Sequence, residues 1–445
     1  MKNNFNDKLL LILGLLFSTF VVFASPKFYF SPDLEDFWKW SIFWGNDWRS
    51  IYTQCASCNY PILGLFSSAG LMNLVGQPDF NRTVFLFRLI LSFVDGLNVF
   101  LIFLIAKWLN VHRPAALAGL IGVLVSTWAG GALWGQIDSI SQFFILLTLG
   151  WLVWKNTHNL PAGFYGWYLA IAAFLSACVM LTKQLTIFSL GSIGLFLLTD
   201  LIFSSPDWKF FFWNFSLTLL VFLLSITSPD FFINLPAGYY SHLVYIWTVG
   251  GQYAWLDRIS ANGFNIWTLI QAGWAGSAHD PIFPQVALTN PYFFSRLLTL
   301  LLSILFTYSL GRFLWEKYQA GEKTLSREII LNFILHLSLI NLCFNVFLTG
   351  THERYLAHFY PFIILAWAGL STFNRHFSGK LLPSLLLIGS SLYGLFILQI
   401  LSSLDFKLGL VPQIILAIFH FGLFVFLMLI TIRYQADPSR STAVN

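Results

Sequence analysis

The stretch VFLFRLILSFVDGLNVFLIFLIA, residues 84–106, decides the fold class. It is long enough to cross a bilayer, because a transmembrane helix needs about 20 predominantly apolar residues. Two charged residues interrupt it, Arg88 and Asp95, which lie two turns apart on one helical face, about 10 Å along the axis. Charged side chains within a span usually face protein or a water-filled cavity. We interpret these two as partners for neighbouring helices rather than as catalytic groups.

The whole chain has the same apolar character. Of its 445 residues, 57% are hydrophobic and 10% are charged, whereas soluble domains carry about 25% charged residues. An α-helix satisfies its own backbone in lipid, so we predict an all-α, polytopic integral membrane protein with about twelve transmembrane helices. The predicted spans are 9–24, 84–106, 114–133, 138–154, 165–181, 186–203, 210–228, 293–314, 329–349, 357–373, 381–402 and 409–432.

Charge in the loops indicates the orientation of these spans. With both termini in the cytoplasm, more than half of the Lys and Arg residues fall in the short inside loops and more than half of the acidic residues fall outside. We expect a multi-pass protein of a bacterial inner or plasma membrane. The N-terminal segment 1–26 is interpreted as an uncleaved first span, with a cleaved signal peptide as the alternative. The net charge of +5 is assigned to topology, and no nucleic-acid partner is expected.

Two long outer loops interrupt what we predict to be one transmembrane domain over residues 1–445. They are residues 25–83 and residues 229–292, with 237–250 as a candidate half-span. The first is expected to carry an interfacial helix. Its apolar face is predicted to consist of Phe37, Trp40, Ile42, Phe43 and Trp44.

The same loop contains a CxxC pair, Cys55 and Cys58. No second Cys or His pair at zinc spacing accompanies it, so a zinc site is not expected. The pair forms either a short disulfide in an oxidising compartment or two free thiols.

Five polar clusters punctuate the apolar background, and the predicted topology places all of them on the outer face. They are Asp33 with Glu35 and Asp36, WGQIDS (134–139), LTKQLT (181–186), SANGFNIW (260–267), and the residues His352 to Tyr355. Three of them lie in very short turns at helix ends. We therefore predict that the clusters share one pocket.

The chemistry of these clusters divides by charge. The cations Lys183, His352 and Arg354 suit a phosphate, which Arg can bind through two hydrogen bonds. The acids, Asp33, Asp36 and Asp138 among them, suit a general base or a bound divalent cation. Together they fit group transfer from a lipid phosphate at the membrane surface. The alternatives are a local ion network at a helix end, a lysine that marks the water interface and solvated acids on a helix surface.

Six motifs in order resemble a known family: PDLEDFWKW (32–40), CNYPI (58–62), WGQIDS, LTKQ (181–184), NGFNIW (262–267) and THERYLAHFYP (351–361). Together they are similar to bacterial mannosyltransferase-like membrane proteins related to GPI mannosyltransferase II, within the GT-C glycosyltransferase superfamily. The resemblance covers residues 30–362. It implies a sugar donor on a polyprenyl phosphate, a multi-spanning helical fold and an active site on the extracytoplasmic face.

The resemblance also implies roles for single residues. The family's acid stands after the first span, four residues before an aromatic residue and seven before a Trp, which selects Asp33 with Phe37 and Trp40. Asp36 is retained as the alternative catalytic acid. The family's lysine turn corresponds to Lys183 and Gln184, its WGQxD to Trp134, Gln136 and Asp138, and its HERY to His352, Glu353, Arg354 and Tyr355.

This chain departs from the family pattern at two places. It has Tyr60-Pro61-Ile62 for the usual YPP, and Thr182-Lys183-Gln184 for the commoner Lys-Pro-Gln. Neither change removes an ionisable group.

The sequence thus predicts an inverting glycosyltransferase that transfers a hexose, with mannose preferred, from a polyprenyl-phosphate sugar to an extracytoplasmic glycan, lipid or protein. Lys183, His352 and Arg354 are expected to bind the donor phosphate. Trp134, Gln136, Asp138, Gln184, Glu353 and Tyr355 are expected to bind substrate. No metal ligands are assigned, and a divalent cation is left open as a cofactor. The alternative function is a secondary transporter or flippase for a lipid-linked or anionic solute, which would need polar groups near the midplane of the membrane.

Overall fold

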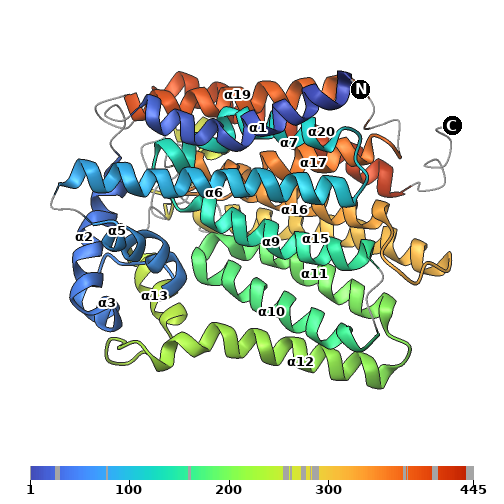
Figure 1. Ribbon diagram of the computed structural model, residues 1–445, viewed down its shortest axis with the longest axis horizontal. Helices are drawn as coiled ribbons and strands as arrows, with labels where there is room; N and C mark the ends of the chain where they lie inside the picture. Colours follow the sequence, from blue (N-terminus) through green and yellow to red (C-terminus); the bar gives the residue numbers. More distant parts are fainter. Residues whose placement is uncertain are drawn as a thin grey trace. The chain divides into compact units, whose positions relative to one another are not determined.

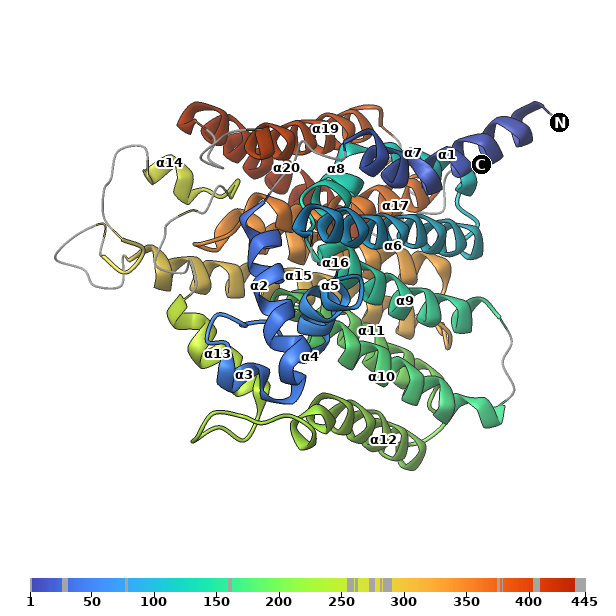
Figure 2. The same ribbon diagram turned by 60° about the vertical axis from the view of Figure 1, so that its left-hand side comes forward.

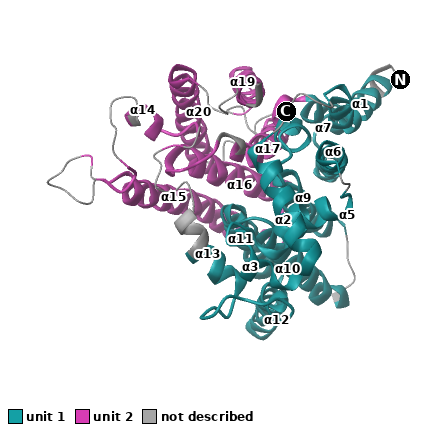
Figure 3. Cartoon of the chain, turned by 90° about the vertical axis from the view of Figure 1, so that its left-hand side faces the viewer, with its two compact units in different colours: residues 1–123, 127–253 teal, residues 124–126, 254–445 magenta. Residues whose placement is uncertain are grey.

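The computed structural model describes residues 2–25, 31–76, 79–158, 162–253, 260, 263–271, 277–280, 282, 290–373, 377, 379–402 and 409–436. These residues form helices and connecting segments, with no β-strand among them. The chain divides into two compact units, residues 1–123 with 127–253 (unit 1) and residues 124–126 with 254–445 (unit 2), coloured separately in Figure 3. The single GT-C-like domain over 1–445 stays a prediction.

Nine helices within the described ranges are long and apolar enough to cross a membrane. They are α1 (Lys2–Ala24), α6 (Phe80–Trp108), α10 (Tyr165–Thr182), α11 (Ile187–Ser204), α12 (Trp208–Thr227), α15 (Pro291–Gln319), α16 (Arg327–Phe347), α19 (Leu381–Ser402) and α20 (Leu410–Ala436). Each corresponds to one predicted span. The all-α, polytopic membrane fold is therefore confirmed.

The other three predicted spans differ in form. The segment 114–133 is α7 (Pro114–Val123) followed, after a bend of 65°, by α8 (Val125–Trp128) and the π-helix η3 (Ala129–Leu133). The helix α9 (Asp138–Thr157) has 20 residues, but Asp138 and other polar residues in its first turns lower its hydropathy. The helix α17 (Tyr360–Leu370) has only 11 residues, because Pro361 opens it and the 3₁₀ helix η9 (Glu353–His358) precedes it.

In unit 1, α6, α9, α10 and α12 lie side by side in sequence order (Figures 1 and 2). Helix α1 packs on α6 and α7 at glycine positions. A Cβ on Gly14 would stand 2.7 Å from the Cα of Gly119, and one on Gly96 would stand 2.8 Å from a backbone oxygen of α1. Without a strong hydrophobic drive between helices in lipid, small residues allow the close backbone approach that holds α1 in place.

The two charged residues of α6 bind neighbouring helices, as their position predicted. The guanidinium of Arg88 donates from Nε to the Ala132 carbonyl at 2.7 Å and from Nη2 to Ser25 Oγ at 3.1 Å. Two turns further along α6, Ser139 donates to Asp95 Oδ1 at 2.5 Å. These bonds join α6 to the end of α1, to η3 and to the start of α9.

The first predicted outer loop is mostly helical. Its elements are α2 (Pro32–Asp47), η1 (Trp48–Ser50), α3 (Ile51–Gln54), α4 (Ile62–Leu65), the π-helix η2 (Phe66–Gly70) and α5 (Leu71–Leu74). The prediction of one apolar face with Ile42 beside Phe37 and Trp40 is wrong. Phe37 and Trp40 are buried in the core of unit 1, whereas Ile42 is 53% exposed. Positions 37 and 40 share a helical face that position 42 does not, so the aromatic side of α2 packs against protein.

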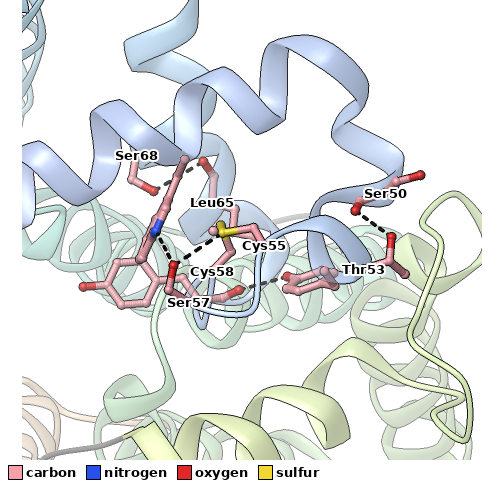
Figure 4. The surroundings of a disulfide bond; sticks show 10 residues. Ser50, Thr53, Cys55, Ser57, Cys58, Leu65 and Ser68 are labelled. Carbon is pink, nitrogen blue, oxygen red and sulfur yellow. Dashed lines mark hydrogen bonds between the residues drawn. A yellow bond between two sulfur atoms is a disulfide. The ribbon is translucent and has the colours of Figure 1, made fainter.

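Cys55 and Cys58 are joined in a disulfide after α3 (Figure 4). Trp40 Nε1 donates to Ser57 Oγ at 3.2 Å, and this hydroxyl lies 3.6 Å from Cys55 Sγ. Of the two possibilities that the sequence left open, the structure has the disulfide. The closed loop leads directly into Asn59 and Tyr60.

The rest of unit 1 consists of η4 (Ala162–Phe164), η5 (Gln184–Thr186), η6 (Ser228–Phe231) and α13 (His242–Tyr253). Helix α13 overlaps the predicted half-span 237–250. His242 Nδ1 lies 2.6 Å from Asp230 Oδ1, which fixes the start of α13 beside η6. This contact joins η6, which follows α12, to the start of α13.

Unit 2 is built around α16, whose membrane-crossing length is entirely buried. It packs against α15, α17 and α20, while α19 packs on α17 and α20. At one end of α16, Glu328 accepts from Lys317 Nζ and from the Tyr434 hydroxyl, each at 2.6 Å. The short helix α14 (Trp267–Gln271) and η9 lie at the other end of α16.

Candidate functional site

Unit 1 brings three of the five polar clusters together. The Trp134 indole donates from Nε1 to Asp33 Oδ2 at 2.6 Å, and the Ser31 hydroxyl donates to the Trp134 carbonyl at 2.8 Å. Ser31 also caps α2 by accepting from the backbone N–H of Leu34. The first turn of α2, which carries Asp33, is therefore attached to the WGQIDS segment.

A glycine turn makes this attachment possible. Gly135 has φ of +80°, a left-handed conformation that L-residues with side chains rarely adopt. A Cβ at this position would also stand 2.4 Å from Leu34 Cδ2. Gly135 thus lets the chain reverse between Trp134 and Gln136 while it lies directly against α2.

The second and third clusters meet in a buried ion pair. Lys183 Nζ lies 2.7 Å from Asp138 Oδ1, and both side chains are almost fully buried, at 4% and 2% exposure. The ring of Tyr60 lies beneath the ammonium, 5.9 Å from its centroid to Nζ. Lys183 follows the last residue of α10 and Asp138 is the first of α9, so the pair joins two helix ends.

Gln184 extends this contact to the disulfide loop. Its side-chain amide donates to the carbonyl of Asn59, and the Tyr52 hydroxyl donates to the carbonyl of Tyr60 at 2.9 Å. A Cβ on Gly64 would stand 2.1 Å from the Thr182 carbonyl, which shows how closely α4 approaches the end of α10. Sequence reasoning placed Asn59 and Tyr60 in the family motif CNYPI but assigned neither of them a contact at the site.

Gln136 lies in the chain between Trp134, which binds Asp33, and Asp138, which binds Lys183. Its side chain is fully buried, and within the described ranges neither its amide nitrogen nor its amide oxygen has a hydrogen-bond partner. Buried polar groups are nearly always bonded to protein or to water. The substrate-binding role of Gln136 stays a prediction.

The other acids of α2 behave differently from Asp33. Glu35 forms an exposed pair with Lys39 at 2.8 Å, so it reads as a solvated surface acid. Partial burial and the nearby charge of Asp33 raise the pKa of Asp36 above its ordinary value. Asp36 therefore holds its proton more tightly than a solvated aspartate does.

Unit 2 brings the other two clusters together. Asn265 Nδ2 donates to Thr351 Oγ1 at 2.8 Å and to the Leu348 carbonyl at 3.1 Å. A Cβ on Gly263 would stand 2.3 Å from the Thr351 carbonyl. The Trp267 indole donates to the carbonyl of Phe347. Residues 263–267 thus fit closely against the turn that begins THERY.

His352 and Tyr355 are the HERY side chains that the structure describes. His352 is 9% exposed, and its ring lies 5.4 Å from that of Tyr355, which stacks on Phe344 at 5.7 Å. The backbone of Glu353 and Arg354 belongs to η9, but their side chains lie outside the described residues. Their predicted substrate and phosphate contacts stay predictions.

Sequence reasoning missed a cationic group at the start of α15. The guanidinium of Arg296 stacks on the Tyr292 ring, 3.3 Å from its centroid, and the His279 ring lies 4.2 Å from the same ring. Ser295, the neighbour of Arg296, lies 3.5 Å from Thr349 through their hydroxyls. In the sequence, a charged residue near the start of the apolar run that follows Pro291 was the signal that could have indicated Arg296.

The described residues contain no group of three or more His, Cys, Asp or Glu side chains arranged to hold a metal ion. A divalent cation therefore has no assigned ligands. Asp33 and Asp36 stand one helical turn apart on α2.

No protein-family model and no curated protein sequence matches this chain. Among solved structures, the crystal structure of ArnT from Cupriavidus metallidurans bound to undecaprenyl phosphate is similar over 95% of this chain and 77% of that chain, at 12% identity and a TM-score of 0.48.

Proposed function

We propose that this protein is an integral-membrane inverting glycosyltransferase that transfers a hexose, with mannose preferred, from a polyprenyl-phosphate sugar to an extracytoplasmic acceptor. One observation carries the proposal. The Asp33 carboxylate is held by the Trp134 indole within a polar cluster that joins the ends of several apolar helices. The motif resemblance to GT-C mannosyltransferase-like proteins supports the same function.

In the proposed reaction Asp33 removes the proton from an acceptor hydroxyl. The hydroxyl oxygen attacks the anomeric carbon from the face opposite the phosphate, so a new C–O bond forms with inversion. The bond between the anomeric carbon and the phosphate oxygen breaks, and its electron pair leaves with the polyprenyl phosphate. The indole of Trp134 fixes one carboxylate oxygen, which limits the orientations of Asp33 and favours proton transfer. Asp36, whose pKa is raised, is the alternative base.

The departing phosphate needs positive charge nearby. Lys183, His352 and Arg354 are proposed for this role. Lys183 is bonded to Asp138 in the structure, so a phosphate would share or displace that contact. Besides its proposed contact with the substrate, Asp138 holds the Lys183 ammonium in place until the donor binds. Sugar and acceptor contacts are proposed for Trp134, Gln136, Gln184, Glu353 and Tyr355.

The transporter alternative receives less support from the described spans. It requires polar groups near the midplane that can change partners. The midspan acid Asp95 is instead bonded to Ser139 and closely covered by Gly131, where a Cβ would stand 3.0 Å from Oδ1. This environment fits a fixed link between helices.

The test is transfer of a radiolabelled sugar from polyprenyl-phosphate mannose, with polyprenyl-phosphate glucose in parallel, by membranes that contain the full chain. Asp33→Asn should lower turnover by about 10²- to 10⁴-fold, the usual contribution of a general base. Asp47→Asn is the matched control, because Asp47 ends the same helix and only caps η1. Wild-type turnover in Asp33→Asn would show that Asp33 is not the base. Uptake of the donor into vesicles without transfer would favour the transporter.

A further inference from the structure

A cavity lies in unit 1 among its apolar helices. A cavity of about 220 Å³ is enclosed by α10, α11 and α12. Leu169, Ala173 and Ser176 of α10 form its buried floor. Its rim includes Phe215 and Leu219 of α12, which are exposed at 41% and 45%, and Gly194 of α11. The cavity therefore opens between α11 and α12.

The lining of this cavity is apolar even where it carries hydroxyls. Ser176 Oγ donates to the Ala172 carbonyl at 2.7 Å, and Thr218 Oγ1 donates to the Asn214 carbonyl at 2.7 Å. Both hydroxyls thus satisfy their donors within their own helices. Water in this space would find few partners, whereas a hydrocarbon chain needs none. The occupant that fits is an alkyl chain from the membrane.

The position of the basic residues indicates where the headgroup of that lipid lies. Between residues 162 and 231 the chain has two basic residues, Lys183 and Lys209. Lys183 is buried against Asp138, whereas Lys209 is exposed in the first turn of α12. Trp208 and Trp167 are exposed near the same end, at 73% and 69%, as is typical of the membrane–water interface.

The distances along α12 agree with one chain of a bilayer lipid. Phe215 lies six residues after Lys209, about 9 Å along the helix, and Leu219 lies about 15 Å from it. The hydrocarbon half-thickness of a bilayer is about 15 Å. Position 209 is turned by about 120° from Phe215 and by about 80° from Leu219 around the helix, so a chain whose phosphate rests at Lys209 passes over the surface of α12 before it reaches the rim within one leaflet.

We infer that the crevice of α10, α11 and α12 binds one acyl chain of an anionic phospholipid whose headgroup phosphate contacts Lys209. The cavity lies along the middle of these helices, and Lys209 lies at their opposite end from Lys183. The inference does not depend on the proposed glycosyl transfer. It assigns to this chain a bound lipid that stabilises the α10–α12 group.

Two glycines of α11 provide the test. Neither Gly194 nor Gly191 has any atom near the place of an added Cβ, so both accept a side chain, but only Gly194 lines the cavity. The full chain is placed in nanodiscs of phosphatidylcholine that contain phosphatidylglycerol with a photoreactive diazirine in one acyl chain. After irradiation, labelled peptides are identified by mass spectrometry.

Wild-type protein should be labelled on α10, α11 and α12. The amount of label should fall about tenfold in Gly194→Phe, because a ring that fills the cavity replaces the buried chain. In Gly191→Phe the amount of label should stay at the wild-type level. Lys209→Gln should lower labelling by phosphatidylglycerol and leave labelling by a diazirine phosphatidylcholine unchanged. Gly194→Leu serves as the second cavity variant if Gly194→Phe unfolds on heating earlier than wild type.

Equal labelling of the Gly194 and Gly191 variants overturns the inference, because the label then reports only lipid exposure. Displacement of the label by undecaprenyl phosphate, but not by unlabelled phosphatidylglycerol, also overturns it and assigns the crevice to a polyprenyl chain. Labelling that Lys209→Gln leaves unchanged overturns the headgroup assignment.

Discussion

The indole nitrogen of Trp134 lies 2.6 Å from Oδ2 of Asp33, although 101 residues separate them in the chain. Ser31 links the two segments, because it caps α2, whose first turn carries Asp33, and donates to the Trp134 carbonyl. The carboxylate is thus oriented by a donor whose own backbone is bonded to the cap of α2. This arrangement gives the first prediction.

Trp134→Phe removes the N–H donor and keeps an aromatic ring. A hydrogen bond to a charged group contributes about 1.5–3 kcal/mol, so sugar transfer should fall by about 10- to 100-fold if the whole of it acts in the transition state. Transfer from a labelled polyprenyl-phosphate sugar measures the effect. Trp151→Phe is the control, because its indole donates to the Tyr168 carbonyl elsewhere in unit 1. Equal loss in both variants would mean that the effect comes from packing.

The buried pair of Lys183 and Asp138 gives the second prediction. Lys183→Met leaves the Asp138 carboxylate buried without its cation, which should lower the free energy of unfolding by about 3–5 kcal/mol. The double variant Lys183→Met with Asp138→Leu should recover part of this loss, since no charge then stays buried. Thermal unfolding in detergent compares the variants.

The control for this experiment is the exposed pair of Lys39 and Glu35. Lys39→Met should leave the melting temperature unchanged, because water screens both groups. If Lys183→Met and Lys39→Met behave alike, the buried pair does not hold the ends of α9 and α10 together. If the double variant is no more stable than Lys183→Met, the loss arises from Lys183 packing rather than from the orphaned charge.

The raised pKa of Asp36 gives the third prediction, on pH dependence. The folded state binds the Asp36 proton more tightly than the unfolded chain does, so this group favours folding at pH below its unfolded pKa. That contribution is lost as the pH rises through the folded pKa. Asp36→Asn should therefore raise the melting temperature at pH 7 and have little effect near pH 3.

Melting curves of wild type and Asp36→Asn between pH 3 and pH 8 measure this dependence. Glu35→Gln is the control, because Glu35 lies beside Asp36 but is solvated and paired with Lys39. A gain in Asp36→Asn that is the same at every pH would contradict the prediction, since it would not report the proton.

The sequence was sufficient for the nine long apolar helices and for the polar segments that meet in each unit. Apolar runs located the long helices, because a span must satisfy its backbone internally. Polar residues that interrupt such runs located Asp33, Trp134 and Lys183, because polar groups within or beside a membrane need a partner or a function. Both inferences use only local composition.

What the sequence could not provide are the pairings. Lys183 was predicted to bind phosphate and Asp138 to bind the acceptor, yet the two form one ion pair across 45 residues. Which side chains meet depends on helix packing, and here on backbone approaches that glycines allow, such as Gly64 against the Thr182 carbonyl. The exposed Ile42 is a different kind of error, because position 42 lies off the helical face of positions 37 and 40 and the helical period alone would have shown this.

The fourth prediction concerns the disulfide of Cys55 and Cys58, which leads into Asn59 and Tyr60 beside Gln184 and Lys183. Loss of the bond in the double variant Cys55→Ser with Cys58→Ser should lower the free energy of unfolding by about 2 kcal/mol, the loop-closure value for so short a loop. Hydrogen exchange of the peptide around Lys183 should also rise, because the disulfide loop holds that turn. Cys178→Ala, at a free buried cysteine of α10, is the control. Exchange that stays at the wild-type rate in the double variant would separate the disulfide from the site.

The last prediction compares two adjacent glycines in η3. A Cβ on Gly131 would stand 2.0 Å from Ser139 Oγ, whereas one on Gly130 would meet nothing within 4 Å. Gly131→Ala should therefore push Ser139 off Asp95 and lower the free energy of unfolding by about 1–3 kcal/mol, as overpacking does. Gly130→Ala should be neutral or slightly stabilising, because alanine has the higher helix propensity. Thermal unfolding of both variants decides the matter. If they melt together, η3 has room to move away from α9, and the Asp95–Ser139 contact does not fix these helices.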